Sequence, residues 1–134
     1  MILPNDTTVL VANGEKLRLY RNKGLEPHIR LVELPEPKLD THNRGSGGHH
    51  RSTTANPDEK RLAEDNFAIA VAEYVNGEVL AGHIAALYVI ADPRSLGEMR
   101  PHFHASTRQA LVGELAKDLT HHSAGELEAA LTGH

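Results

Sequence analysis

Ile84-Ala-Ala-Leu-Tyr-Val-Ile-Ala91 and the Asp92-Pro93 that follows it decide the fold. The first stretch is apolar without alternation, which is typical of a central strand covered on both faces. Asp92-Pro93 supplies a cap residue and a proline for the first helical position, so a helix is predicted from there to about Arg100. The sequence therefore predicts a buried strand that leads into a helix.

Three further strands are predicted on the amino-terminal side. Thr7–Ala12 is rich in β-branched residues, and it ends at Asn13-Gly14, a strong hairpin signal because both residues accept a positive φ. The alternation of Lys16–Tyr20 predicts the second strand of that hairpin. His28–Leu34 predicts a third strand, which ends before Pro35 because proline cannot continue a ladder. Together these residues predict a meander of three strands.

A long helix is predicted to begin at Asn56-Pro57-Asp58-Glu59, where a cap residue is followed by a proline and two acids. The helix is expected to run to about Asn76-Gly77, or one turn further to Gly82. Apolar residues at three- and four-residue spacing predict its buried stripe: Ala63, Phe67, Ala70, Val71 and Tyr74.

The carboxyl-terminal part predicts a short helix over about His104–Gln109, a strand over Leu111–Leu119 and a last helix. Ser123 caps this last helix, with Glu126 at the capping-box spacing. We expect it to pack beside the helix that begins at Pro57. The whole order is three strands, a helix, a strand, two helices, a strand and a helix. This order predicts an α/β fold with a mixed sheet of about five strands.

Length and composition restrict the class of protein. The 134 residues are enough for a single domain, 1–134. No apolar run approaches the length of a membrane span and no signal peptide is visible, so we expect a cytoplasmic protein that does not bind a membrane. The chain has no cysteine, and its ten histidines form no known zinc pattern. We therefore expect neither a metal nor a cofactor.

Residues 36–56 are predicted to form a long, flexible and irregular loop. No acidic residue occurs from Thr41 to Pro57, although the whole chain has a net charge of −4. One interpretation is a flexible connection; the other is a basic, glycine-rich loop that meets phosphates. In the second interpretation the RNA-binding residues are Arg44, Gly47, Gly48, His49, His50 and Arg51.

Acidic residues near strand ends have two interpretations each. Asp92 follows the carboxyl end of the predicted central strand, where ligands bind in open α/β sheets, but a helix cap requires the same residue type. Glu114 and Asp118 flank the last strand and are interpreted as solvated acids. Of the two interpretations of Asp92, the helix cap is favoured.

Three blocks of the chain resemble the bacterial host attachment protein family: Val9–Lys16, Tyr88–Arg100 and Val112–His122. They extend from the first predicted strand to the last predicted helix, so the resemblance covers nearly the whole chain. The name of that family describes a phenotype, attachment to host cells, and no chemistry. The residues that match the family motifs are Asp92, Pro93, Arg94, Gly97, Arg100, Lys117, Asp118 and Thr120.

That family is similar in turn to the middle domain of eukaryotic and archaeal class-one peptide release factors. This similarity implies an RNase H-like sandwich and a loop before the long helix that carries Gly-Gly-Gln into the peptidyl-transferase centre. Gly47 and Gly48 match the two glycines, and His49 stands where the glutamine would be. His49 is thus the candidate catalytic residue. However, the loss of the glutamine, and a first strand without the carboxylates of a nuclease, argue against an enzyme.

Two functional hypotheses follow. The first is a translation-associated factor that acts at stalled or idle ribosomes through residues 44–52, with the ribosome or a structured RNA as its partner. The second is a non-enzymatic module that binds a protein partner or has a regulatory role, and that influences attachment to host cells in this way. An enzyme with a metal held by histidines is a more distant third.

Overall fold

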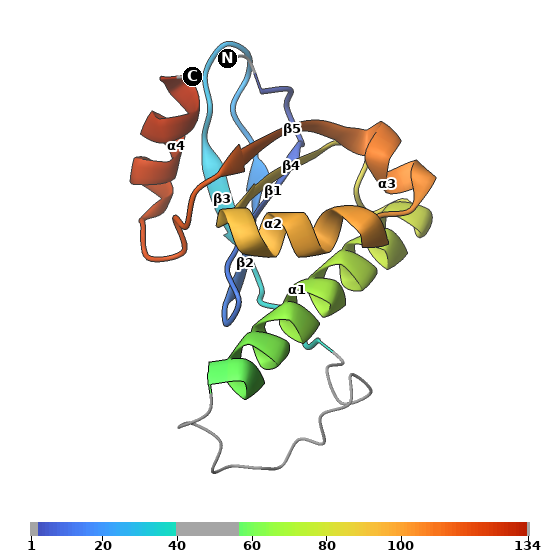
Figure 1. Ribbon diagram of the computed structural model, residues 1–134. Helices are drawn as coiled ribbons and strands as arrows, with labels where there is room; N and C mark the ends of the chain where they lie inside the picture. The colour runs from blue at the N-terminus through green and yellow to red at the C-terminus, as the bar shows by residue number, and fades with distance from the viewer. Residues whose placement is uncertain (1–2, 40–56, 134) are drawn as a thin grey trace.

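The computed structural model describes residues 3–39 and 57–133 (Figure 1). Most of the predicted basic loop, from residue 40 to residue 56, lies outside the described residues, and residues 35–39 have no regular structure. The elements are, in chain order, β1 (Thr8–Ala12), β2 (Leu17–Asn22), β3 (Leu31–Leu34), α1 (Pro57–Leu80), β4 (Leu87–Ala91), α2 (Pro93–Met99), the 3-10 helix η3 (Arg100–His102), α3 (Ala105–Ala110), β5 (Leu111–Ala116) and α4 (Ala124–Thr132).

The five strands form one mixed sheet in the order β3-β2-β1-β4-β5. β1, β4 and β5 are parallel to one another, whereas β2 is antiparallel to both β1 and β3. This confirms the predicted α/β class with a mixed sheet. β1 occupies the middle position, and β4, predicted at the centre as Ile84–Ala91, lies next to it and begins at Leu87. Every residue of β1 and β4 is buried, because both strands are covered on both faces.

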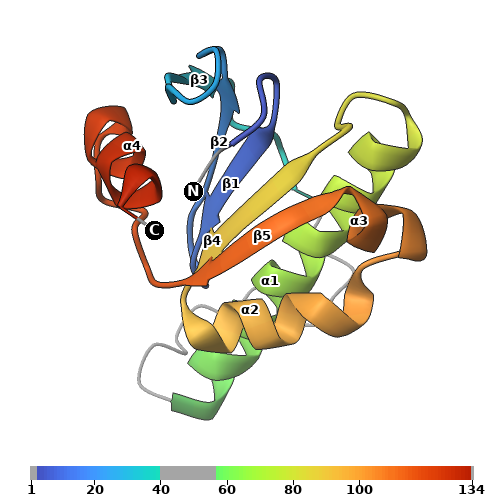
Figure 2. The ribbon, with the colours of Figure 1, turned by 90° about the horizontal axis from the view of Figure 1, so that it is seen from above.

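Helices cover both faces of the sheet (Figure 2). α1 and α2 lie on the face to which Leu10 and Val89 point, and α3 packs against α1. α4 lies on the opposite face, where its Leu127 packs in one cluster with Val9 and Tyr88. The prediction that this last helix packs beside α1 is therefore wrong. An apolar stripe shows that a helix is packed on a sheet, but it does not show on which face.

The buried stripe of α1 begins later than predicted. Ala63 is exposed, because the first turns of the helix extend beyond the sheet (Figure 1). Phe67 and Tyr74 are half-buried against the core, and Ala70 is buried. The residues that α1 contributes to the core follow at helical spacing: Ala68, Val71, Ala72 and Val75. Contacts other than core burial must therefore hold the early turns of α1.

β3 and β5 are also shorter than predicted, because side-chain hydrogen bonds replace the ladder at one end of each strand. β3 begins at Leu31 rather than His28, since Oδ1 of the buried Asn22 accepts the N–H of Arg30 at 2.9 Å. β5 ends at Ala116 rather than Leu119, since Asp118 turns the chain there.

The capping box predicted at Ser123 is confirmed. Oγ of Ser123 accepts the N–H of Glu126 at 3.1 Å, and the Glu126 carboxylate accepts the N–H of Ser123 at 2.8 Å. Within residues 3–39 and 57–133, no helix combines the length and apolar character that a membrane span requires.

Candidate functional site at the carboxyl edge of the sheet

The three parallel strands bring the three sequence blocks to one edge of the sheet. β1, β4 and β5 run in the same direction, so the residues that directly follow them, Asn13, Asp92 and Lys117, share that edge. The chain leaves β4 toward α2 on one face and leaves β5 toward α4 on the other. Where neighbouring connections diverge in this way, open α/β sheets bind their ligands. We call residues 13–18, 92–95 and 117–122 the carboxyl-edge site.

Asn13 joins the β1–β2 hairpin to the segment after β5. Its Oδ1 accepts hydrogen bonds from the backbone N–H groups of Glu15 and Lys16, both at 2.7 Å. Its Nδ2 donates to Oδ2 of Asp118 and to Oγ1 of Thr120, both at 3.1 Å. The turn predicted from Asn13-Gly14 is confirmed. The same side chain also holds the hairpin against a segment that is more than a hundred residues away along the chain.

Thr120 completes this network from the other side. The residue is 2% exposed, and its hydroxyl donates to Oδ1 of Asp118 at 2.7 Å. Its N–H donates to the same oxygen at 3.1 Å. Burial raises the pKa of Asp118, but the hydrogen bonds from Thr120 and Asn13 lower it by more, so the pKa lies below the usual 3.8. Asp118 is exposed, as predicted, yet its carboxylate is held by three hydrogen bonds.

Arg18 on β2 forms hydrogen bonds with the same segment after β5. Its Nη1 donates to the carbonyl oxygens of Thr120 and His122 at 2.9 and 3.0 Å. Its Nε and Nη2 each lie 3.3 Å from the Glu33 carboxylate, and the guanidinium stands 5.5 Å from the ring centre of Tyr20. Each side-chain nitrogen of Arg18 therefore has a partner within the protein, so this guanidinium stabilises the fold and is not free to bind a ligand.

A depression of about 490 Å³ opens beside this network. Charged groups of both signs line it, with carboxylates from Glu15, Glu33 and Glu36 and basic nitrogens from Lys16, Arg18 and His121. Because these charges oppose one another, the depression does not by itself favour a phosphate group.

Asp92 caps α2, so the cap interpretation is confirmed. Its Oδ2 accepts the N–H of Ser95 at 3.1 Å, and Pro93 occupies the first turn. Its Oδ1 is buried and has no hydrogen-bond partner among the described residues. A buried acceptor without a partner costs about 1–3 kcal/mol.

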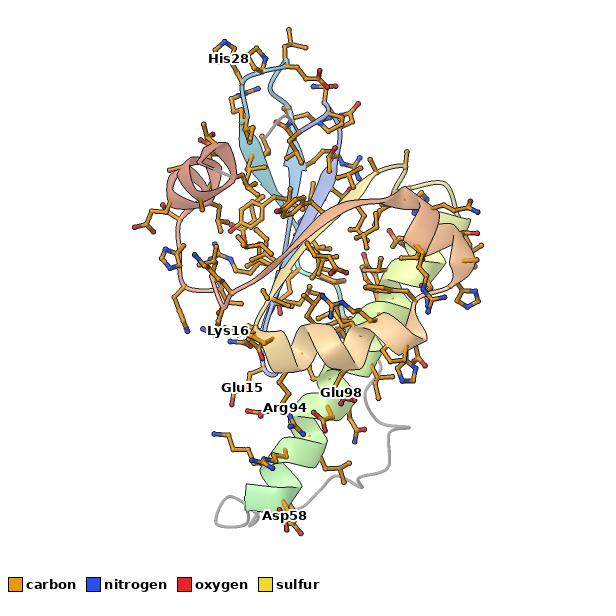
Figure 3. The ribbon with its side chains drawn as sticks, turned by 45° about the horizontal axis from the view of Figure 1, so that its top comes forward. Glu15, Lys16, His28, Asp58, Arg94 and Glu98 are labelled. Carbon is orange, nitrogen blue, oxygen red and sulfur yellow. The ribbon has the colours of Figure 1, made fainter. Side chains whose placement is uncertain are left out.

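Contacts with α2 and with the β1–β2 hairpin help to hold the part of α1 that extends beyond the sheet. Arg94 of α2 donates to both carboxylate oxygens of Asp65 on α1, at 3.0 and 2.8 Å. The hairpin also touches α1, since a Cβ on Gly14 would come within 2.6 Å of Cβ of Glu64. In Figure 3 the labelled Glu15, Lys16, Arg94 and Glu98 lie toward the end of the molecule where α1 begins, and His28 lies at the opposite end.

The remaining motif residues differ in their contacts. Arg100 binds Glu114 of β5 with a shortest distance of 2.7 Å, so Glu114 is paired and not merely solvated. Lys117 is exposed. Gly97 is surrounded by open space, because a Cβ added to it would meet no atom within 4 Å. Nothing in the fold therefore requires glycine at position 97.

The predicted RNA-binding residues and the catalytic candidate are not placed by the structure. Arg44, Gly47, Gly48, His49, His50 and Arg51 all lie outside the described residues. In the part of the chain that is described, no three His, Asp or Glu side chains gather as they would around a metal ion.

The side-chain roles of Asn13 and Arg18 were not foreseen from the sequence. Their partners are about a hundred residues away, so no local pattern could indicate them. Asp118-x-Thr120 did carry a local signal, because Asp commonly accepts the N–H two residues on.

The fold and the carboxyl-edge site define a small α/β protein in which helices cover both faces of a single mixed sheet. Residues 6–131 match the family model of bacterial archaeo-eukaryotic release factor family 12. The match extends from just before β1 into the last turn of α4, and the chain belongs to this family. The likeness to release factors that the three sequence blocks implied is thereby confirmed. A search of curated proteins found no match.

Proposed function

We propose that this protein is a translation-associated factor that binds the ribosome or a structured RNA. Membership of a release-factor family carries the proposal, since it points to a role in translation. The match over residues 6–131 includes residues 40–56, which we call the basic segment. Its Arg44 and Arg51 are suited to binding phosphates on either side of its glycines. A ribosomal partner also implies a cytoplasmic location.

The position of the basic segment in the fold supports its use as the binding element. In the release factors that this chain resembles, the corresponding loop precedes the long helix. Here residues 40–56 are followed directly by α1, which has 24 residues. The contacts of Arg94 and Gly14 fix the first half of α1 and therefore the point where the basic segment joins the fold.

Within this proposal the chain is one domain comparable to the middle domain of a release factor, with an RNase H-like arrangement. The sheet order β3-β2-β1-β4-β5 and the helices on both of its faces support this assignment.

The proposed role is binding, not hydrolysis. β1 consists of Thr-Val-Leu-Val-Ala and contributes no carboxylate for nuclease chemistry. The segment has Gly47-Gly48-His49 in place of Gly-Gly-Gln. His49 is retained in the proposal as an RNA contact.

Co-sedimentation of the whole protein with purified ribosomes across a potassium chloride series tests the proposal. Contacts between arginines and phosphates predict binding that falls steeply between about 50 and 200 mM salt. Binding that does not change with salt, or no binding at all, would favour the alternative of a protein-interaction module that influences attachment to host cells.

A further inference from the structure

A second basic surface lies on the described part of the chain. Residues 99–113 contain no Asp or Glu but include Arg100, His102, His104 and Arg108. All four of these residues are exposed. They belong to η3, to α3 and to the link between them, and we call residues 100–108 the basic elbow.

The backbone of the basic elbow is fixed by a buried amide. Asn76 of α1 is 5% exposed, and its Nδ2 donates to the carbonyl oxygen of His102 at 2.8 Å. Its Oδ1 accepts the N–H of His104 at 3.0 Å and the hydroxyl of Thr107 at 2.7 Å. Phe103 is buried in the core below. The four exposed side chains are therefore carried on an ordered backbone, which lowers the entropy lost when they bind a partner.

The elbow carries an excess of positive charge. Nη2 of Arg108 donates to the carbonyl oxygen of Arg100 at 3.1 Å, which brings the Arg108 guanidinium beside the start of η3. Arg100 is paired with Glu114, but Arg108 forms no ion pair within the described residues. The basic elbow thus carries two guanidinium groups, of which one is paired with a carboxylate, and two exposed imidazoles.

We propose that the basic elbow is a second contact surface for the phosphate backbone of RNA, with Arg108 as its principal contact. This inference rests on the proposed function. A guanidinium that is held in place but not neutralised by a carboxylate is well suited to a phosphate, since it presents several N–H donors in one plane. The histidines add exposed N–H donors to the same surface.

The two basic features connect to α1 at different ends. The basic segment joins α1 at Pro57, whereas the elbow packs on Asn76 near its other end (Figure 1). At 1.5 Å per residue these points are about 30 Å apart along the helix.

The test is co-sedimentation of full-length Arg108→Ala with purified ribosomes across the potassium chloride series. We expect several-fold weaker binding and a slope of log K against log salt that is smaller by about one. Arg108→Glu should weaken binding further, and Arg108→Lys should keep most of it. Arg30→Ala is the matched control, because Arg30 is also exposed and also forms no ion pair among the described residues.

The outcomes separate this inference from the proposed function. If the unaltered protein binds and Arg108→Ala binds equally well with the same slope, the elbow is no RNA contact and the proposed function stands. If Arg30→Ala weakens binding as much as Arg108→Ala does, the effect is one of net charge and the inference is overturned. If the unaltered protein binds no ribosomes, both fail. Thermal melting of each variant confirms that its fold is intact.

Discussion

Asn13, Asp118 and Thr120 form a hydrogen-bonded cluster between the hairpin and the segment after β5. Each polar atom in it has a partner within 3.1 Å, and the Thr120 hydroxyl both donates and accepts. A paired polar group of this kind adds modestly to the free energy of unfolding. Removal of one partner lowers that free energy by more, because the other group is left without a hydrogen bond. The cluster therefore fixes the relative position of two segments, Asn13-Gly14 and Lys117–Thr120.

Thr120→Val tests how much the Oγ1 atom of Thr120 contributes to the stability of the cluster. The substitution keeps the shape of the side chain but removes the hydroxyl, so an amide hydrogen of Asn13 and an oxygen of Asp118 each lose a partner. We expect a loss of about 1–3 kcal/mol in the free energy of unfolding, measured with urea. Thr120→Ser retains the hydroxyl and should lose much less. Equal losses in the two variants would contradict this role.

The lowered pKa of Asp118 predicts a dependence of stability on pH. The folded protein holds this carboxylate ionised more firmly than the unfolded chain does, so the unfolded chain binds the proton more readily. The stabilisation is complete well above the ordinary pKa of 3.8 and is lost as the pH falls through the lower folded value. The difference in unfolding free energy between the unaltered protein and Asp118→Asn should shrink from pH 6 to pH 3. A difference that is constant over this range would contradict the assignment.

At the level of the elements, local signals were sufficient to predict the helix starts. Asp92 and Ser123 cap their helices through residues three positions away, so the sequence contains the whole contact. The face chosen by α4 and the exposure of Ala63 could not be predicted, because both depend on how the finished sheet is covered. The shortening of β3 depends on the side chain of Asn22. Its hydrogen bond with the N–H of Arg30 forms only once the chain has folded. For the same reason, most of the carboxyl-edge site was not foreseen.

Two glycines, Gly113 on β5 and Gly97 on α2, should respond in opposite ways to alanine. On β5 a Cβ at Gly113 would lie 2.6 Å from the ring of Tyr88, which is itself 2% exposed and cannot easily move. Gly113→Ala should therefore cost about 1–3 kcal/mol. On α2 a Cβ at Gly97 meets only open space, so Gly97→Ala should stabilise the protein by about 0.4–1 kcal/mol. Thermal melting of the two variants checks both signs, and a stabilising Gly113→Ala would show that the strand is not packed as described.

At the scale of the whole molecule, α1 connects two basic features. Its first turns extend past the sheet and are held there by Asp65–Arg94 and by the close approach of Gly14 to Glu64. Its other end holds the basic elbow through Asn76. The bulk of the protein is acidic, with a net charge of −4, so binding to RNA depends on these local surfaces and not on the overall charge.

The central claim is tested most directly by changing Arg44 and Arg51 together to alanine and measuring ribosome co-sedimentation across the salt series, beside thermal melting. The account predicts an unchanged melting temperature, clearly weaker binding, and a slope of log K against log salt that is smaller by about two. Arg30→Ala combined with Lys23→Ala removes the same charge elsewhere and should leave binding largely intact. Ribosome binding by the folded Arg44→Ala, Arg51→Ala variant that equals that of the unaltered protein would contradict the account.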